Sequence, residues 1–433
     1  MIRPAFVYVW CALVLCAFAL CGSPLLAASG DEWPQWRGTN RDGISPDKGL
    51  LKVWSEDGPP LAWKGTNIGI GLSAVSVAGG KVFTMGDRGD SGYVICLDAA
   101  DGKEVWAQKV GAKSNCGNNG EGPHATPAID GKMLYALTGN GELACLETAT
   151  GKEVWKKDYK KDFGGHMMSG WNYSESPLVD GDRLICTPGG KDSTLVALDK
   201  KTGKEIWHSK ADFDDGKKDG GGAAYASIVI SKGGGVKQYV QLLGHGIVGI
   251  RAEDGKQLWG YTKIANGTAN VPTPIVKDDY VFCVTGYGTG AALLKLKSSS
   301  DGVNAEQVYF LKGNELQNTH GGVIMVGDYI YGGHQHNNGF PFCLEWKTGK
   351  VLYNKERGPG KGSAAVGYAD GLFYFRYEDG VMSLLDMQHD GFKVLSKFKI
   401  PDVKKPSWPQ PVIVGGKLYL REQDTLYCYN VKG

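Results

Sequence analysis

The chain has 433 residues, including 65 glycines and 10% aromatic residues, and a formal net charge of +2. A nearly neutral chain creates no large electrostatic field, and we find no lysine- or arginine-rich run with interleaved aromatic residues, so nucleic acid and anionic membrane surfaces are not expected partners. The many glycines and aromatic residues favour an all-β protein with tight turns.

Residues 1–29 have the order of a secretory signal peptide. Arg3 is followed by an apolar run over residues 5–20 and then by small residues at 27–29. We therefore expect an exported protein, periplasmic or extracellular. No later stretch approaches eighteen apolar residues, so no membrane span is expected. Residues 30–58 are expected to form an N-terminal extension or strap, and the protein is expected to be a monomer.

Regularly spaced tryptophans mark the ends of repeated units: Trp63, Trp106, Trp155, Trp207 and Trp259. The unit over 122–159 contains four short apolar stretches separated by glycine turns, near 126–129, 133–137, 143–147 and 153–156. Units of roughly 40–50 residues with four strands each are typical of β-propeller blades. No window shows sustained helical periodicity, so we expect almost no helix.

Similar units recur near 71–111, 122–159, 173–210, 223–263, 269–312, 318–357 and 362–399. A last unit, 407–433, has three expected strands and lacks the fourth. Residues 60–65 contain Leu61–Lys64, which reads as the end of a unit but follows no unit of its own. Because a propeller must cover its open edges, we predict that this strand completes the last blade. The result is a single eight-bladed β-propeller of four-stranded blades over 59–433.

The ends of three units, 97–106, 146–155 and 198–207, share a turn of Asp/Thr-Gly-Lys followed by Glu, Val or Ile, and Trp. They resemble the tryptophan-docking repeats of the pyrroloquinoline quinone (PQQ) dehydrogenase-like propellers, a superfamily that also contains the outer-membrane-assembly lipoprotein BamB. The opening 33–45, WPQWRGTNRDGIS, further resembles exported bacterial members from planctomycete-type organisms. The resemblance implies that each Trp docks between neighbouring blades and buries a large area.

The resemblance also implies PQQ with calcium as a cofactor pair, but the sequence departs from that pattern. PQQ alcohol dehydrogenases of this fold show an adjacent Cys-Cys pair, a catalytic Asp and Glu/Asn calcium ligands. This chain has no Cys-Cys pair, and no base or calcium ligand can be placed by matching a motif. No cofactor is therefore assigned from the sequence, and the catalytic residues are unknown.

Ten cysteines include three in the predicted signal peptide, where Leu20 before Cys21 disfavours lipid attachment. Four others occupy one repeated strand position: Cys96, Cys145, Cys343 and Cys428. The third and fourth repeats carry Ala or Gly there, so the position requires a small buried side chain. We expect no stable disulfide, and Cys116, in a polar loop, is the candidate for an exposed thiol.

Propeller topology indicates where a binding site would lie. The loops that precede each first strand share a face with the loops between second and third strands, and we call this the His/Trp-rich face. The candidate ligand-binding residues on it are His124, His166, Trp171, Glu175, Tyr225, His245, Asn270, Tyr287, His320, His334, His336, Arg376, Trp408 and Arg421. The pair His334 and His336 could bind a transition metal, but it has no carboxylate partner in the sequence pattern, so no metal is assigned.

Two functions follow from these features. The first is a non-catalytic scaffold that binds a small molecule or a protein partner, both unidentified, through the His/Trp-rich face. The alternative is a PQQ-dependent quinoprotein dehydrogenase that oxidises an alcohol or a sugar at the same face. The docking repeats do not separate the two because a fold does not fix a function.

Overall fold

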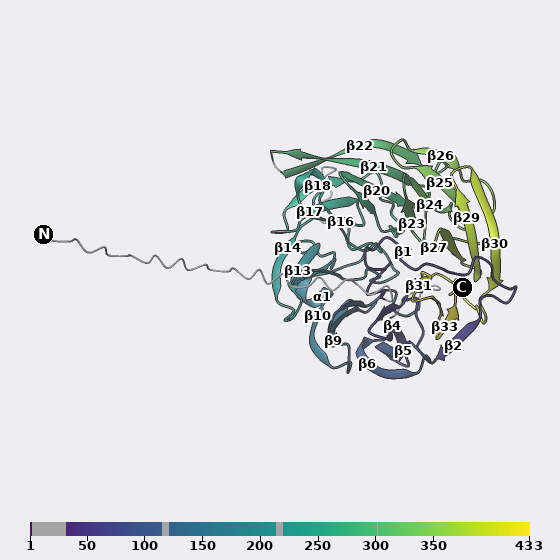
Figure 1. Ribbon diagram of the computed structural model, residues 1–433. Coiled ribbons are helices and arrows are strands. Elements are labelled where there is room, and N and C mark those ends of the chain that lie inside the picture. The colour runs from purple at the N-terminus through teal and green to yellow at the C-terminus, as the bar shows by residue number, and fades with distance from the viewer. Residues whose placement is uncertain (2–31, 115–120, 214–219, 301) are drawn as a thin grey trace.

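A computed structural model describes residues 1, 32–114, 121–213, 220–300 and 302–433; residues 2–29 of the predicted signal peptide and Cys116 lie outside the described residues. The chain forms a ring of eight antiparallel sheets (Figure 1). Seven sheets have four strands, and the seventh blade has a fifth strand because a short N-terminal strand joins it. The structure therefore confirms the predicted all-β, eight-bladed propeller.

The first four blades run from the channel to the rim as follows: β3–β6 (Ser76–Ala78, Lys81–Arg88, Ser91–Asp98, Glu104–Ala112), β7–β10 (Ala128–Asp130, Met133–Leu137, Glu142–Glu147, Glu153–Asp158), β11–β14 (Leu178–Asp180, Arg183–Cys186, Leu195–Asp199, Glu205–Ser209) and β15–β18 (Val229–Ser231, Gln238–Leu242, Ile247–Arg251, Gln257–Tyr261). The next four are β19–β22 (Ile275–Lys277, Tyr280–Thr285, Gly290–Ser299, Gly302–Lys312), β23–β26 (Val323–Val326, Tyr329–His334, Phe340–Glu345, Lys350–Tyr353), β27–β30 (Ala364–Ala369, Leu372–Tyr377, Val381–Gln388, Gly391–Lys399) and β31–β33 (Val412–Val414, Lys417–Glu422, Thr425–Asn430) with β2 (Leu61–Thr66). Among the described residues, helix is confined to α1 (Tyr159–Phe163), which Asp158 caps, and a 3₁₀ turn at Gly233–Gly235.

The eighth blade is closed by the two ends of the chain, as predicted. Strand β2 pairs antiparallel with β33, with Lys64 opposite Tyr427 and Thr66 opposite Thr425. This pairing gives the C-terminal three strands their fourth and removes an open edge.

Docking aromatic residues join six of the eight blades to the next one along the chain. The indole nitrogen donates to a backbone carbonyl of the following blade in four cases: Trp63 to Ala99 (3.0 Å), Trp106 to Thr148 (3.1 Å), Trp155 to Lys200 (3.1 Å) and Trp207 to Ala252 (3.3 Å). In the fifth and sixth blades, which lack this Trp, the phenols of Tyr309 and Tyr353 donate in the same way. Trp259 differs, because its indole donates to Gln238 of its own blade. Trp63 thus occupies the docking position predicted for it.

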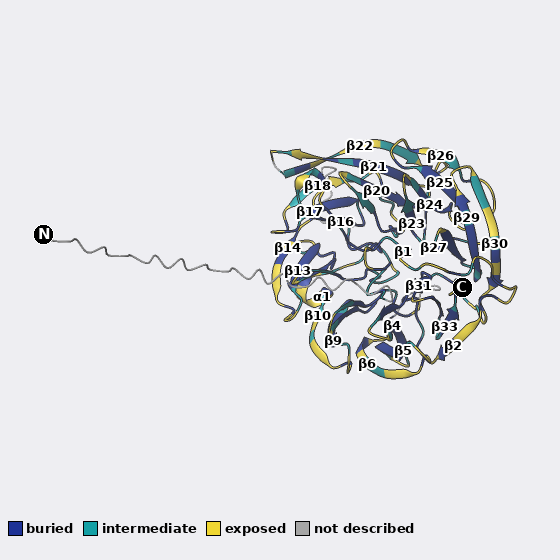
Figure 2. Ribbon diagram, viewed as in Figure 1, coloured by how far each residue is buried: buried dark blue, intermediate teal, exposed yellow. Residues whose placement is uncertain are grey.

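Every outer strand has a register shift where its docking position begins. Such a bulge turns one residue out of the ladder and bends the strand. Val105, Val154, Ile206 and Val308 are the residues turned out, and they are exposed on the rim. Figure 2 shows the exposed residues gathered on these outer strands, around a buried interior. The bulges both direct the aromatic ring inward and disrupt the outer edge against pairing with another chain.

A segment of the N-terminal extension, residues 33–45, lies in the central channel, and we call it the channel segment. It contacts the innermost strand of successive blades, or the loop that leads to it: Trp33 meets Val77, Pro34 meets Ile129, Arg41 meets Ser176 and Ile228, Trp36 meets Thr273, Arg37 meets Val323, and β1 (Ile44–Ser45) pairs with β27. Because the innermost strands surround the axis, a short segment that reaches seven blades must cross the channel; β1 lies near the centre of the ring in Figure 1. This part of the extension therefore fills the channel rather than running over the surface.

The six cysteines of the described residues are buried and free: Cys96, Cys145, Cys186, Cys283, Cys343 and Cys428. Burial raises the pKa of the Cys96 and Cys145 thiols to about 12, so they are protonated at neutral pH. Within the same part of the chain, no helix is long and apolar enough to cross a membrane.

Candidate functional site

A pocket of about 400 Å³ opens on the His/Trp-rich face at the end of the channel. Loops before the first strands supply His124, Trp171, Tyr225, His320 and Trp408, and loops between second and third strands supply Tyr287, His336 and Glu378. The channel segment contributes Trp36 and Arg37, which close the pocket toward the channel. Seven of the fourteen candidate residues of the His/Trp-rich face thus line this one pocket. A volume of this size is typical of small-molecule pockets.

Aromatic rings line the pocket in pairs that hold one another. Trp171 and Tyr225 meet edge to face with centroids 6.1 Å apart, and the Tyr225 hydroxyl lies 2.6 Å from Ser169 Oγ. Tyr287 packs on His336 at 4.9 Å. Aromatic contacts of this geometry add stability beyond the area they bury. The rings are therefore held in place before a ligand arrives.

One wall carries a charged group, Glu378. The Trp408 indole donates to its Oε1 at 2.8 Å, and His320 Nδ1 lies 3.5 Å from the same oxygen while its ring stacks on Trp408 at 4.9 Å. Burial by itself raises the pKa of Glu378, but the nearby His320 and the Trp408 donor outweigh it and bring the pKa below its ordinary value. Glu378 is therefore an ionised acceptor at neutral pH.

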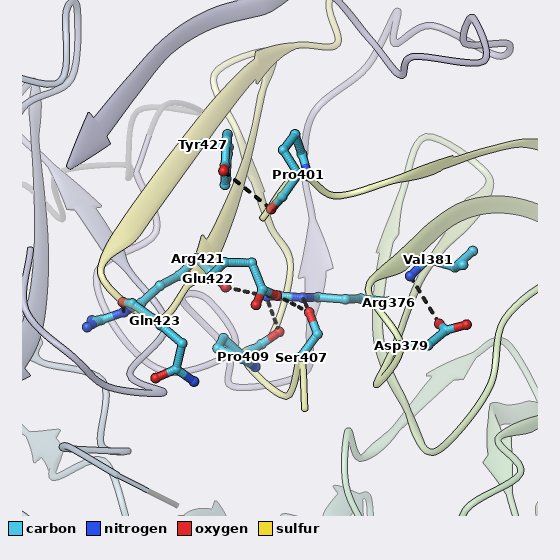
Figure 3. Close-up of polar contacts among 10 residues, drawn as sticks. All are labelled: Arg376, Asp379, Val381, Pro401, Ser407, Pro409, Arg421, Glu422, Gln423 and Tyr427. Atoms are coloured by element: carbon cyan, nitrogen blue, oxygen red, sulfur yellow. Dashed lines mark hydrogen bonds and ion pairs between the residues drawn. The ribbon is translucent and has the colours of Figure 1, made fainter. Parts of the chain in front are cut away.

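Two predicted site residues, Arg376 and Arg421, lie outside the pocket. Figure 3 shows Arg376 with its partners Ser407, Pro409 and Glu422. Arg376 is fully buried and donates to Ser407 Oγ (2.9 Å), to the Pro409 carbonyl (2.8 Å) and to Glu422. Arg421 donates to Thr84 Oγ1 at 2.6 Å and to the Gly69 carbonyl at 2.7 Å, both in or before the first blade. Their guanidinium groups are thus used to fasten blades seven, eight and one.

Five other predicted residues are also outside the pocket lining: His166, Glu175, His245, Asn270 and His334. Glu175 is buried and accepts from the Tyr159 hydroxyl (3.0 Å), and burial raises its pKa. Asn270 is buried and donates to the Leu243 carbonyl at 3.0 Å. His334 is buried and its Nδ1 accepts from the Gln317 backbone N–H, while burial lowers its pKa. These groups brace the loops beneath the pocket.

The pocket residues that sequence reasoning missed include Trp36, Arg37, Ser174, Glu378, Asn337 and Gln410. Ser174 lies within a loop already recognised, where His124 Nδ1 contacts its hydroxyl at 3.0 Å. Glu378 lies in the loop after the second strand of its blade, and the sequence analysis had assigned such loops to the His/Trp-rich face. Trp36 and Arg37 belong to no blade, so the repeat gave no signal for them.

The described residues that line the pocket do not supply the ligands that calcium-bound PQQ requires. Calcium takes about six to eight oxygen ligands, with carboxylates prominent among them. Glu378 is the one carboxylate among the described residues of the lining, and its Oε1 already accepts from Trp408. Across the described residues, no group of three or more His, Cys, Asp and Glu side chains is placed to hold a metal ion. His334 and His336 are likewise separated, one buried behind the wall and the other on the pocket surface.

Solved structures with the same architecture span enzymes and a design. A quinohemoprotein alcohol dehydrogenase from Pseudomonas putida HK5 is 13% identical, with a TM-score of 0.64 over 93% of this chain and 81% of that one. A europium-containing methanol dehydrogenase is 13% identical, with a TM-score of 0.64 over 92% and 91%. The computationally designed Ika8 protein is 11% identical, with a TM-score of 0.57 over 86% and 100%. At such identities these likenesses establish the fold alone.

Among curated protein sequences, no match to the chain was found. A family model described as outer membrane protein assembly factor BamB matches residues 47–117 and 90–355, which together span more than half of the chain. This protein therefore belongs to that family of PQQ-like β-propellers.

Proposed function

We propose that this protein is an exported, non-catalytic binding propeller that holds a small ligand in the pocket of the His/Trp-rich face. The observation that carries the proposal is the pocket itself: about 400 Å³, walled by paired aromatic rings and closed by the channel segment. Apolar walls with a few fixed polar groups are what ligand sites share. Export rests on the signal-like order of residues 1–29.

The test is a comparison of variants on opposite faces. Trp171→Ala and Trp408→Ala remove pocket walls, whereas Lys204→Ala alters an exposed turn between strands β13 and β14 on the other face. Ligands retained from the native envelope should be lost from the two pocket variants and kept by Lys204→Ala. Equal loss from Lys204→Ala would contradict the proposal.

Dehydrogenase activity is the competing function, and a simple activity assay distinguishes it from non-catalytic binding. Purified protein supplied with PQQ, calcium and an alcohol or sugar should reduce no artificial electron acceptor above the rate of the protein-free control. Sustained dye reduction that Glu378→Gln abolishes would refute the non-catalytic proposal.

A protein partner is the second binding function, and the family's description as an assembly factor favours it. Such a partner would insert a side chain or a loop into the same pocket. The partner would then compete with a small ligand for the pocket. A competition assay with wild-type protein, in which the small ligand is added to the complex with the partner, decides whether the two share the site.

A further inference from the structure

Two arginines of the channel segment are almost equally buried, at 4% exposure for Arg37 and 5% for Arg41. The guanidinium of Arg41 is fully engaged by the protein. It donates to the Gln35 side chain (2.8 Å) and to the carbonyls of Ser176 (3.0 Å), Ile228 (3.1 Å) and Pro177. Arg41 therefore fastens blades three and four, and its role is structural.

Arg37 is engaged only in part. Its Nη2 donates to the carbonyls of Val323 (2.6 Å) and Asp42 (3.0 Å), but its Nε is buried without a hydrogen-bond partner. No carboxylate of the described residues forms an ion pair with Arg37. Burial lowers its pKa to about 10, which the nearby Asp42 charge opposes, so it still carries its charge at neutral pH. A buried cation without an anion is costly to hold.

The protein keeps space for this guanidinium. A side-chain carbon at Gly322 would lie 2.2 Å from Arg37 Nη1, and one at Gly43 would lie 2.9 Å from Nη2. Both glycines have positive φ, 67° and 78°, which other residues adopt at a cost. Arg37 and Gly322 both line the pocket, so the residue borders the space that a ligand would occupy.

The other residues of the lining indicate which chemical class of ligand the pocket favours. Flat rings of Trp36, Trp171 and Trp408 can pack against a sugar or aromatic ring, and Ser174, Asn337 and Gln410 offer hydrogen bonds to hydroxyl groups. Ionised Glu378 accepts from hydroxyls but repels a second negative charge. The wall therefore favours a hydroxyl-rich ligand with one acidic group over a polyanion such as PQQ.

We infer that the pocket binds a sugar acid with a single carboxylate, which pairs with Arg37 while the hydroxyls bond to Glu378 and its polar neighbours. The inference rests on the proposed function and names the class of its ligand. Both hydrogens of Arg37 Nη2 already go to the Asp42 and Val323 carbonyls, so the carboxylate would accept from Nη1, the nitrogen next to Gly322. A lysine there would keep the charge but not the position of this donor. Arg37 is thus assigned as the residue that selects acidic over neutral sugars.

The experiment measures calorimetric binding of two matched pairs to the wild-type protein: D-glucuronate with D-glucose, and D-galacturonate with D-galactose. In at least one pair the acid should bind about tenfold or more tightly than the neutral sugar. Arg37→Gln should remove that preference, Arg37→Lys should retain part of it, and Lys204→Ala should leave it unchanged. Because Arg37→Gln can fail to fold, Arg37→Lys and the wild-type pairs test the inference independently.

Each contrary result has a distinct meaning. Equal binding of acid and neutral sugar that Trp171→Ala weakens would overturn the ligand class and leave the proposed function standing. No binding of any of the four sugars, or PQQ binding more tightly than both uronates, would overturn the inference. Uronate binding that survives Trp171→Ala and Trp408→Ala would overturn the inference and the proposed function together.

Discussion

Replacing Trp63 with alanine should cost the protein several kilocalories per mole of stability, although the residue lies in a six-residue strand near the N-terminus. Its indole is 7% exposed, donates to Ala99 at 3.0 Å and faces the Tyr419 ring at 5.9 Å. A side-chain carbon on Gly102 would lie 2.4 Å from the ring, so the indole packs directly on the turn of the first blade. Trp63 thus joins blade eight to blade one.

The magnitude follows from the buried ring. Large aromatic side chains bury about 150–250 Å², worth roughly 25 cal/mol per Å², and measured Trp-to-Ala losses in cores are about 3–5 kcal/mol. Trp207→Ala is the matched control, because Trp207 is 8% exposed and makes the same bond to the next blade. Chemical denaturation followed by circular dichroism should show similar losses for the two variants. A loss below about 1 kcal/mol for Trp63→Ala, beside a large loss for Trp207→Ala, would refute closure through Trp63.

Three further predictions concern charge and thiols. Burial raises the pKa of Asp87 to about 6, so between about pH 4 and pH 6 the folded protein binds a proton that the unfolded chain has released. The stability of wild type relative to Asp87→Asn should therefore fall as the pH rises through this window, and a pH-independent difference in urea denaturation would contradict the assignment. Glu422→Ala leaves the buried Arg376 without its anion and should cost about 3 kcal/mol or more, against under about 1 kcal/mol for Glu104→Ala in the exposed pair with Arg88. The six described cysteines should be unreactive toward a thiol reagent in native protein and all react after denaturation without reductant; a thiol count lower by two would reveal a disulfide.

The repeat made most of the fold predictable. Tryptophan spacing and glycine turns indicated the blades, and the incomplete last unit indicated that residues 60–65 close the ring, which β2 confirms. The path of residues 33–45 could not be predicted in this way. Nothing in the repeat specifies a segment that crosses the channel, and its contacts are bonds from Arg37 and Arg41 to carbonyls of distant blades.

The candidate site residues were likewise predictable only in part. Tyr287 and His336 lie in loops beyond a second strand and reach the pocket, whereas His334, Arg376 and Arg421 lie within β24, β28 and β32 and are buried. The sequence argument assigned all five to the His/Trp-rich face, but only two of them line the pocket. Whether a side chain points to the pocket or between blades depends on the last residues of the strand, and the pattern alone did not locate the strand end closely enough.

Native mass spectrometry of the protein isolated from its own cell envelope tests the central claim most directly. The account predicts a non-covalent adduct with the mass of a small acidic ligand, present in wild type and Lys204→Ala and absent from Trp171→Ala and Arg37→Gln. An adduct that persists in both pocket variants, or wild-type protein that carries none after gentle isolation and binds none of the matched sugars, would contradict the assignment of this pocket as the binding site.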